Sequence, residues 1–262
     1  KNMKFKNKKS LGQNFLIDKN ILKKITDIVK ISNNDKVIEV GPGNGNLTKY
    51  LIEKKPAYLK IIEKDNELIK ILSNKFKDQI EIFHKDILKV SEDFYDDDVI
   101  IYGNLPYNIS TKILAKWCLS KKNKFKRLIL MFQKEVADRI IAKENSKNYG
   151  RLSILTSWKM NKLKIIDIDP VYFYPKPKVW SSLITLTPKL KFETLQKAKH
   201  LEYVTNIFFN QRRKMIRKPM KQLFANFEMI AKQLDINLDL RPQNLSKEKY
   251  LEICKMYEDL SH

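Results

Sequence analysis

The sequence predicts an α/β protein in which a doubly wound parallel sheet precedes a small all-α domain. Short apolar, β-branched runs alternate with helical patterns through the first two-thirds of the chain, and strand signals stop after Pro188. Alternation of this kind is typical of a parallel sheet covered by helices. We therefore expect one domain over residues 1–188 and a helical domain over residues 189–262.

The individual elements follow from periodicity and from proline positions. Seven runs are candidate strands: residues 37–40, 58–62, 80–83, 99–102, 128–132, 164–168 and 183–187. Helical spacing of apolar residues predicts a helix over 67–76. The Pro-rich stretch 169–178 is expected to lack regular structure, because proline fixes φ and removes a donor. Helices of the second domain are expected over residues 195–209, 212–218, 220–234 and 246–260.

Length and composition exclude several classes of protein. The chain has 262 residues, 43% of them hydrophobic, which is enough to bury a core. The longest apolar run has five residues, whereas a membrane span needs about 20. Two cysteines without a CxxC pair and three histidines argue against a disulfide framework and a metal site. A reducing compartment is expected, the cytoplasm first and an organelle as the alternative.

The positive charge of the chain is large and clustered. Lysine and arginine number 52 against 30 acidic residues, so the net charge is +22. Residues 108–133 include seven basic side chains and no acidic one, and residues 211–221 include six and none. Solvated helix faces usually mix the two signs, so such runs indicate contact with phosphates. A lysine-rich genome is the alternative explanation for the total.

A glycine-rich turn follows the first strand of the predicted sheet. Residues 37–40 lead into Gly41-Pro42-Gly43-Asn44-Gly45, and a helix is expected to begin near Leu47. Glycines allow the backbone to approach a ligand, and the helix N-terminus offers unpaired N–H groups. The pattern is GxGxG, not the GxGxxG typical of dinucleotide sites. A purely structural turn is the alternative.

Two carboxylates follow the next two strands. Glu63 lies 22 residues after Gly41, where an acid can accept hydrogen bonds from both ribose hydroxyls. Asp86 follows the third strand and could accept from the amino group of an adenine. Either residue alone could be a surface acid. Three such features at successive strand ends predict a nucleoside-binding pocket.

The tetrapeptide Asn104-Leu105-Pro106-Tyr107 follows the fourth strand. Asn104 offers a side-chain carbonyl, Pro106 keeps the Leu105 carbonyl out of helical bonding, and Tyr107 offers a flat face. Two acceptors beside an aromatic ring suit a planar base with an exocyclic amine. They could localise the lone pair of that nitrogen so that it attacks a methyl sulfonium. A turn without catalytic function is the alternative.

The glycine turn and this tetrapeptide together resemble S-adenosylmethionine-dependent adenine-N6 methyltransferases. Five further segments are similar to the KsgA family, the small-subunit rRNA adenine dimethyltransferases: residues 12–16 (GQNFL), 149–153 (YGRLS), 173–181 (FYPKPKVWS), 209–214 (FNQRRK) and 240–242 (LRP). The similarity extends over about residues 8–255. It implies a Rossmann-like class I methyltransferase sheet with a small all-α C-terminal domain.

The resemblance also implies roles for individual residues. Six would bind S-adenosylmethionine: Asn14, Leu16, Gly41, Glu63, Asp86 and Asn104. Five would form the catalytic site: Asn104, Leu105, Pro106, Tyr107 and Phe173. Tyr107 and Phe173 would hold the target adenine between their rings. The family converts two adjacent adenines near the 3′ end of small-subunit rRNA to N6,N6-dimethyladenine, late in subunit assembly. A monomer acting on a pre-30S-type particle, without a metal or a membrane, is implied.

The segment around Phe173 contains one departure from the family pattern. Phe173 lies in a proline-stiffened aromatic loop and is expected to be exposed there. Relatives usually have a small or acidic residue where this chain has Trp180. That side chain could add a stacking surface or cover the edge of a strand.

A basic surface is expected in the helical domain. Arg213, Arg217 and Lys221 are spaced four residues apart and would form one stripe if the helix continues, but Pro219 is expected to interrupt the helix and bend the stripe. With Arg212 and Lys214 they are the candidate contacts for rRNA phosphates, and a solvated face is the alternative. Such contacts position an enzyme without reading sequence.

Three other functions compete with this interpretation. The nearest is the erythromycin-resistance type of large-subunit rRNA methyltransferase, which shares the fold and the Asn-Leu-Pro-Tyr site. Residues 209–214 and 240–242 favour the small-subunit group. An assembly or transcription factor without catalysis is disfavoured by the presence of Glu63, Asp86, Asn104 and Tyr107. An NAD enzyme is disfavoured because no hydride-acceptor constellation is evident.

Overall fold

The structure, a computed structural model, describes residues 14–122 and 124–260. The chain divides into two compact units. The first comprises Lys1–Ile113, Lys122–Ala137 and Leu163–Pro188, and the second comprises Leu114–Lys121, Asp138–Lys162 and Lys189–His262. The C-terminal segment expected to form a helical domain thus belongs to the second unit with two earlier segments. The boundary near residue 188 stays a prediction.

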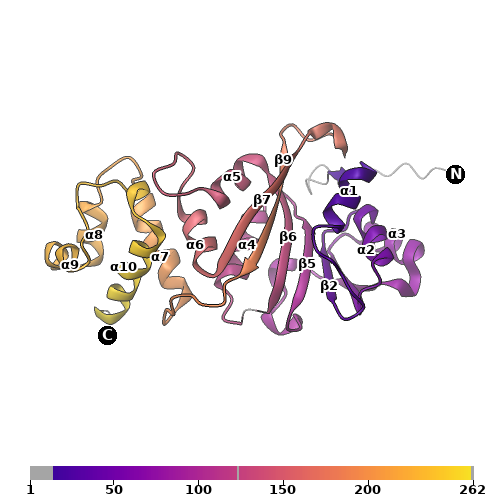
Figure 1. Cartoon of the computed structure of the whole chain (residues 1–262), viewed down its shortest axis with the longest axis horizontal. Coiled ribbons are helices and arrows are strands. Elements are labelled where there is room, and N and C mark those ends of the chain that lie inside the picture. Colours follow the sequence, from indigo (N-terminus) through magenta and orange to yellow (C-terminus); the bar gives the residue numbers. More distant parts are fainter. Residues whose placement is uncertain (1–13, 123, 261–262) are drawn as a thin grey trace. The chain divides into compact units, whose positions relative to one another are not determined.

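A seven-stranded mixed sheet has the order β4-β3-β2-β5-β6-β9-β7. Figure 1 labels five of these strands, β2, β5, β6, β9 and β7. Its strands are β2 (Lys36–Val40), β3 (Tyr58–Glu63), β4 (Glu81–His84), β5 (Val99–Asn104), β6 (Phe125–Gln133), β7 (Met160–Ile168) and β9 (Ser181–Pro188). The predicted α/β fold is confirmed. The sheet is parallel from β4 to β6, but β9 runs antiparallel to β6. The connection from β7 to its neighbour β9 has no crossover helix, which a parallel pair would require.

A second, two-stranded sheet lies outside the large one. Strand β1 (Phe15–Leu16) pairs antiparallel with β8 (Phe173–Tyr174), with Phe15 opposite Tyr174 and Leu16 opposite Phe173. The 3-10 turn Pro170–Tyr172 precedes β8. The expectation that residues 169–178 lack regular structure is therefore wrong at these five residues. Phe173 and Tyr174 retain backbone N–H groups, so the prolines on either side do not prevent pairing.

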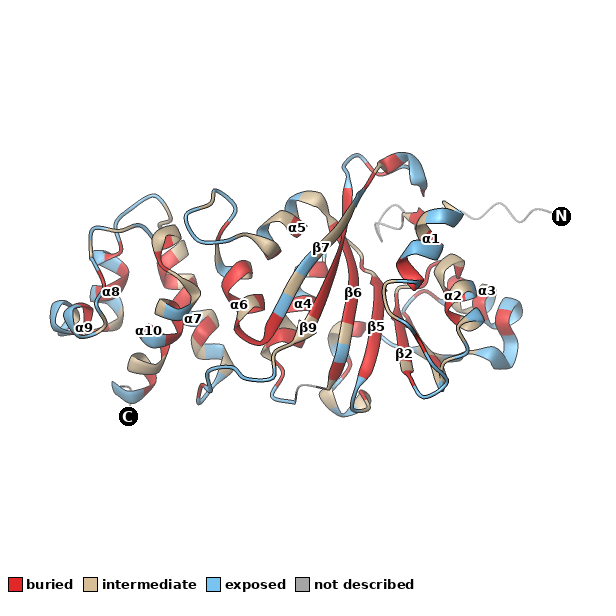
Figure 2. Cartoon of the chain, viewed as in Figure 1, coloured by how far each residue is buried: buried red, intermediate tan, exposed pale blue. Residues whose placement is uncertain are grey.

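Helices α1 (Lys19–Thr26), α2 (Asn46–Glu53) and α3 (Asn66–Phe76) belong to the first unit, and α4 (Ser110–Leu119) and α5 (Lys134–Ile141) follow β5 and β6. Aspartates begin two of these helices: Asp18 accepts from the Ile21 N–H at 2.9 Å, and Asp65 accepts from the Glu67 N–H at 2.8 Å. Strands β2 and β5 are buried along almost their whole length (Figure 2). Burial on both faces is typical of a parallel sheet and fixes the strand ends that form the site.

The second unit is built around α6 (Arg151–Lys159), α7 (Ala198–Phe209) and α10 (Lys247–Leu260), with the shorter α8 (Arg217–Leu223) and α9 (Phe227–Gln233). Its core includes Trp158, Phe208 and Tyr250. Among the described residues, no helix is long and apolar enough to cross a membrane.

Two helix predictions in the second unit are wrong in their bounds. The helix expected over 212–218 begins at Arg217, and the helix expected over 220–234 is split because Phe224 has extended backbone angles. Pro219 lies in the first turn of α8, where its missing N–H would have no helical partner anyway. It therefore does not interrupt the helix.

Candidate active site

The strand order creates a ligand crevice beside β2. The chain runs from β2 outward to β3 and β4, and then returns to place β5 on the other side of β2. Open α/β sheets bind ligands at the carboxyl ends of the strands at such a reversal. The four neighbouring strands β4, β3, β2 and β5 end near Asp86, Glu63, Gly41 and Asn104 respectively. The topology brings together four residues that the sequence predicts to act in one site.

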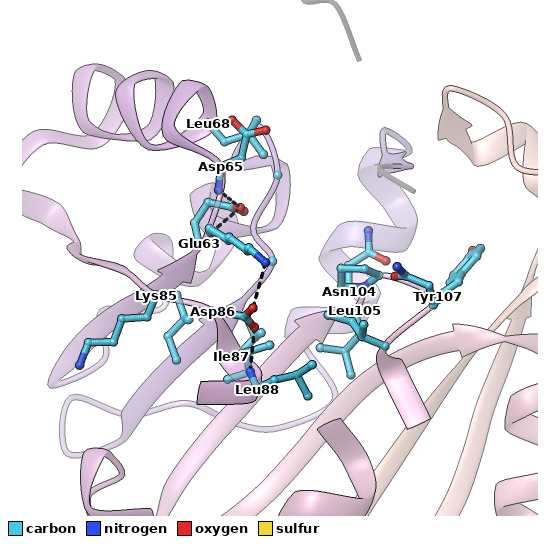
Figure 3. A pocket seen from close by; sticks show the side chains of 18 of the residues that line it. Glu63, Asp65, Leu68, Lys85, Asp86, Ile87, Leu88, Asn104, Leu105 and Tyr107 are labelled. Carbon is cyan, nitrogen blue, oxygen red and sulfur yellow. Dashed lines mark hydrogen bonds and ion pairs between the residues drawn. The ribbon is translucent and has the colours of Figure 1, made fainter. Parts of the chain in front are cut away.

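A pocket occupies this crevice and has one polar and one apolar component (Figure 3). Its polar lining includes Asn14, Glu63, Asp86 and Asn104. Its apolar lining includes the predicted Leu105 and four residues that the sequence reasoning missed: Ile62, Leu68, Ile87 and Leu88. These four residues lie within or shortly after predicted strands and helices, so no sequence signal distinguished them from core residues. Flat apolar walls with a few polar groups are typical of sites for cofactors.

The glycine turn allows two close approaches that a side chain would prevent. Gly41 has a φ of +67°, and a Cβ there would lie 3.0 Å from the Asn104 carbonyl oxygen. Gly43 has a φ of +60°, and a Cβ there would lie 2.4 Å from the Phe15 ring. Helix α2 begins at Asn46, one residue before the expected start. Because these two glycines lack side chains, the end of β5 and the Phe15 ring can pack against the turn.

Glu63 is held by the backbone that follows it. Its Oε1 accepts hydrogen bonds from the N–H groups of Lys64, at 2.7 Å, and Asp65, at 2.8 Å. Burial raises the pKa of the carboxyl although these two bonds lower it. Because both bonds use Oε1, Oε2 is left to accept from a ligand hydroxyl. The geometry fits the ribose-binding role predicted for this residue.

Asp86 has the opposite electrostatic environment. Its Oδ1 accepts from the Leu88 N–H at 3.0 Å, and its Oδ2 pairs with the Lys64 ammonium at 2.9 Å. The hydrogen bond from Lys64 is the main cause of a lowered pKa. The carboxylate therefore stays ionised, which strengthens it as a hydrogen-bond acceptor. The Lys64 side chain is 68% exposed, so it can move aside for a ligand.

Asn104 has a fixed amide orientation at the end of β5. Its Nδ2 donates to the Asn14 carbonyl at 3.0 Å. Since the amide nitrogen is used in this bond, the Oδ1 atom is the group left to act as an acceptor. Figure 3 shows Glu63 and Asp86 on one side of the pocket and Asn104 on the other.

The three residues after Asn104 have different environments. The Leu105 side chain is 1% exposed and anchors the turn. The Pro106 carbonyl accepts from the Ile109 and Ser110 N–H groups, at 3.1 and 3.0 Å. Helical bonding thus begins at Pro106, and the Leu105 carbonyl lies before it. The hydroxyls of Tyr107 and Ser181 lie 2.5 Å apart, which fixes the tyrosine ring.

Phe173 does not lie where the sequence predicts. Its side chain is 3% exposed and packs in the core of the first unit, so the expected exposed loop position is wrong. Alternation along β8 explains the difference: Phe173 faces inward while Tyr174, the next residue, is 66% exposed. The part of Phe173 in holding an adenine stays a prediction.

The N-terminal segment supplies one pocket residue and one anchor. Asn14 lines the main pocket, as predicted for a cofactor contact. Leu16 lines a smaller neighbouring cavity, and its carbonyl accepts from the Asn46 Nδ2 at 2.8 Å. Residues 12 and 13 of the predicted motif lie outside the described residues.

Glu39 is a second buried carboxylate that sequence reasoning did not single out. It lies on β2, is 2% exposed, and its Oε2 accepts from the Thr48 hydroxyl at 2.6 Å. Burial, with a smaller effect from Glu63, raises its pKa to about 7. An acid inside an otherwise apolar strand was the available signal.

The five candidate RNA contacts of the second unit differ in their surroundings. Arg212 is half-buried, and it donates to the Gln243 side chain and the Lys147 carbonyl. Arg217 pairs with Glu228 and Asp239. Arg213, Lys214 and Lys221 are exposed, and within residues 14–122 and 124–260 no carboxylate pairs with them. The predicted stripe is wrong at Arg213, which precedes the start of α8.

The sheet order, the glycine turn and the two carboxylates at the ends of neighbouring strands define a class I, S-adenosylmethionine-dependent methyltransferase. A sequence model described as "Ribosomal RNA adenine dimethylase" matches residues 4–259. The chain belongs to this family.

Individual relatives agree over nearly the whole length. A "Ribosomal RNA small subunit methyltransferase A" of Pelagibacter ubique (strain HTCC1062) is 54% identical, covering 97% of this chain and 98% of the relative. A protein of the same name from Wolbachia sp. subsp. Drosophila simulans (strain wRi) is 39% identical, covering 97% and 95%.

Two solved structures have similar folds. A dimethyladenosine transferase from Plasmodium falciparum has a TM-score of 0.75 and 25% identity, covering 94% of this chain and 98% of that one. The 23S rRNA methyltransferase ErmE has a TM-score of 0.69 and 21% identity, covering 95% and 100%. The likeness to ErmE shows the fold alone.

The described residues fit S-adenosylmethionine, the cofactor of this class. The pocket beside the glycine turn has an apolar lining that suits an adenine ring, Glu63 leaves one carboxylate oxygen for a ribose hydroxyl, and Asp86 offers an acceptor for an adenine amine. Asn104 lies across the pocket from both carboxylates (Figure 3).

Proposed function

We propose that the chain transfers methyl groups from S-adenosylmethionine to the N6 amines of two adjacent adenines near the 3′ end of small-subunit rRNA. The product is N6,N6-dimethyladenine, and the reaction belongs to late subunit assembly. The substrate is a pre-30S-type particle, and the enzyme acts as a monomer. Family membership and the relatives' names support this function.

The orientation of Asn104 is the observation that carries the proposal. The bond from its Nδ2 to the Asn14 carbonyl points the Oδ1 acceptor toward an incoming amine. The Leu105 carbonyl, outside helical bonding, supplies a second acceptor. Two acceptors bind the two N–H groups of one exocyclic amine, and this match selects an adenine in the correct position.

These acceptors also account for the chemistry. They draw the amine away from planarity, so its lone pair is no longer shared with the ring. S-adenosylmethionine supplies an electrophilic methyl group on a sulfonium. As the new N–C bond forms, the C–S bond breaks and S-adenosylhomocysteine leaves as a neutral thioether. The nitrogen proton becomes acidic only in this step and passes to water, so no strong base is needed before the attack. Position and electrostatics supply most of the rate enhancement.

Aromatic and basic side chains hold the RNA. The Tyr107 ring, fixed through Ser181, stacks on the target base, with Phe173 as its predicted partner on the other face. Arg212, Arg213, Lys214, Arg217 and Lys221 supply the phosphate contacts. Target choice then depends on the assembled shape of the RNA.

The test is methyl transfer from labelled S-adenosylmethionine to three substrates: unmethylated small subunits, large subunits, and deproteinised small-subunit rRNA. We expect dimethylation of two adjacent adenines in the small subunit, located by mass spectrometry of nuclease fragments. Label in large-subunit RNA alone would favour the erythromycin-resistance type of enzyme. Sedimentation of the protein alone tests the monomer.

A further inference from the structure

Trp180 directly precedes a residue that contacts Tyr107 of the candidate active site. The next residue, Ser181, has its hydroxyl 2.5 Å from that of Tyr107. The Trp180 carbonyl accepts from the Lys134 N–H at 2.9 Å, and β9 begins at Ser181 opposite Gln133 of β6. The backbone at this tryptophan is therefore fixed at the same strand ends that carry the site.

The Trp180 side chain is exposed although its backbone is fixed. It is 47% exposed, whereas Trp117 is 3% and Trp158 is 4% exposed. An indole that served to cover a strand edge would lose most of its accessible surface. Leaving a large aromatic ring in water has a hydrophobic cost, so the exposure of a ring this close to a catalytic site suggests a ligand.

The charges around Trp180 indicate which ligand. No acidic residue occurs between Asp169 and Glu193 in the sequence. The nearby Asp167 accepts from the Ser182 hydroxyl at 2.6 Å, and its charge is neutralised by ion pairs with Lys134 and Lys164. Lys176 and Lys178 are exposed, and within the described part of the chain no carboxylate pairs with either. An aromatic face flanked by unneutralised lysines matches single-stranded nucleic acid, in which bases stack and phosphates need cations. A protein surface would not require this combination.

We propose that Trp180 stacks on a nucleotide adjacent to the target adenine and so positions the RNA strand, with Lys176 and Lys178 near its phosphates. This rests on the proposed function and adds a substrate-positioning residue to it. Trp180 would act on the binding of RNA, while Asn104 and the Leu105 carbonyl act on the reacting amine.

The experiment compares Trp180→Ala and Trp180→Phe in steady-state methylation of unmethylated small subunits. Trp180→Ala should raise KM for the particle roughly 5- to 150-fold, because one base–aromatic stack is worth about 1–3 kcal/mol. The value of kcat and the affinity for S-adenosylhomocysteine should stay within about twofold, and Trp180→Phe should retain most of the wild-type KM. Tyr203→Ala is the matched control, because Tyr203 is an aromatic on α7 with 46% exposure.

Tryptophan fluorescence gives a second, independent measurement. With Trp117 and Trp158 buried, quenching by a single-stranded oligoribonucleotide should report Trp180, and it should disappear in Trp180→Phe while binding persists. Normal KM in Trp180→Ala, or equal KM increases in both variants, would overturn the proposal. A fluorescence response to ribosomal protein but not to deproteinised RNA would also overturn it. Failure of the wild type to methylate small subunits would instead contradict the proposed function.

Discussion

The pocket of the first unit and the basic segment 211–221 of the second unit hold their functional side chains in different ways. In the pocket, the polar groups of Glu63, Asp86 and Asn104 each have hydrogen-bond partners that set their orientation. In the basic segment, Arg213 and Lys214 are exposed and no described carboxylate pairs with them. The first arrangement fixes atoms in space, and the second places charge on a surface.

This difference predicts different consequences of mutation. A preoriented polar group stabilises the charge that develops in the transition state, so its loss lowers the rate of the chemical step. An exposed cation neutralises RNA phosphates and releases their counterions. Its loss therefore lowers the affinity for RNA and the dependence of this affinity on ionic strength. Kinetic and binding measurements should therefore separate the two regions.

The largest effect is expected for Asn104→Ala. The variant removes the oriented acceptor but leaves RNA binding, so kcat should fall on the order of 10²- to 10³-fold, as for one oxyanion-hole donor. Single-turnover methylation of small subunits measures the effect. The exposed Asn161→Ala is the matched control. Near-normal turnover would remove Asn104 from the reaction and would undo the distinction between the two regions.

Glu39→Gln should stabilise the protein at alkaline pH. In the folded state the pKa is about 7, against 4.5 for an ordinary glutamate, so folding favours the protonated form. Ionising Glu39 in the folded protein therefore lowers the free energy of unfolding. This loss is absent below about pH 4.5, grows up to about pH 7 and is constant above it. It reaches about 3 kcal/mol, since each pKa unit is about 1.4 kcal/mol.

Urea unfolding of Glu39→Gln and the wild type at pH 5 and pH 8 measures this difference. The variant should gain stability at pH 8 and little at pH 5, and the exposed Glu81→Gln should show no such trend. Equal stability of the two proteins at pH 8 would mean that Glu39 is ionised without penalty in the folded state.

Glu63→Gln should weaken cofactor binding without changing the salt dependence of RNA binding. The carboxylate accepts charge-assisted hydrogen bonds, each worth about 1.5–3 kcal/mol, so Kd for S-adenosylhomocysteine should rise roughly 10- to 100-fold. Isothermal titration calorimetry measures it, with the exposed Glu67→Gln as the control. An unchanged Kd would mean that the ribose lies elsewhere in the pocket.

The pocket could be predicted from the sequence far better than the basic surface. Parallel strands with short apolar runs fix where their carboxyl ends meet, so Gly41, Glu63, Asp86 and Asn104 could be placed together before any coordinates. Side-chain partners that come from distant parts of the chain could not be predicted. The bond from Asn104 to the Asn14 carbonyl spans 90 residues, and Ser181 lies 74 residues from Tyr107.

Predictions from local sequence rules were wrong where contacts between distant segments set the structure. Phe173 lies between prolines and looks like a loop residue, but β8 pairs with β1 and turns its ring into the core. Spacing alone placed Arg213 on a helix that begins at Arg217, and it gave no sign that Arg217 pairs with Glu228 and Asp239. Charge spacing predicts a face only after the helix bounds are known.

The smallest effect per residue is expected in the basic segment, and it tests whether this segment acts on RNA binding alone. Combined replacement of Arg213, Lys214 and Lys221 by Ala should lower the slope of log affinity against log salt by roughly 2, at about 0.7–0.9 for each phosphate contact. Filter binding of small-subunit particles at several salt concentrations measures the slope, and kcat at saturating substrate should not change. Arg212→Ala and Arg217→Ala are the contrasting variants, because each of these side chains already has protein partners and its loss should therefore lower the slope less. An unchanged slope in the triple variant would place the RNA surface elsewhere, with the first unit's own lysines as the next candidates.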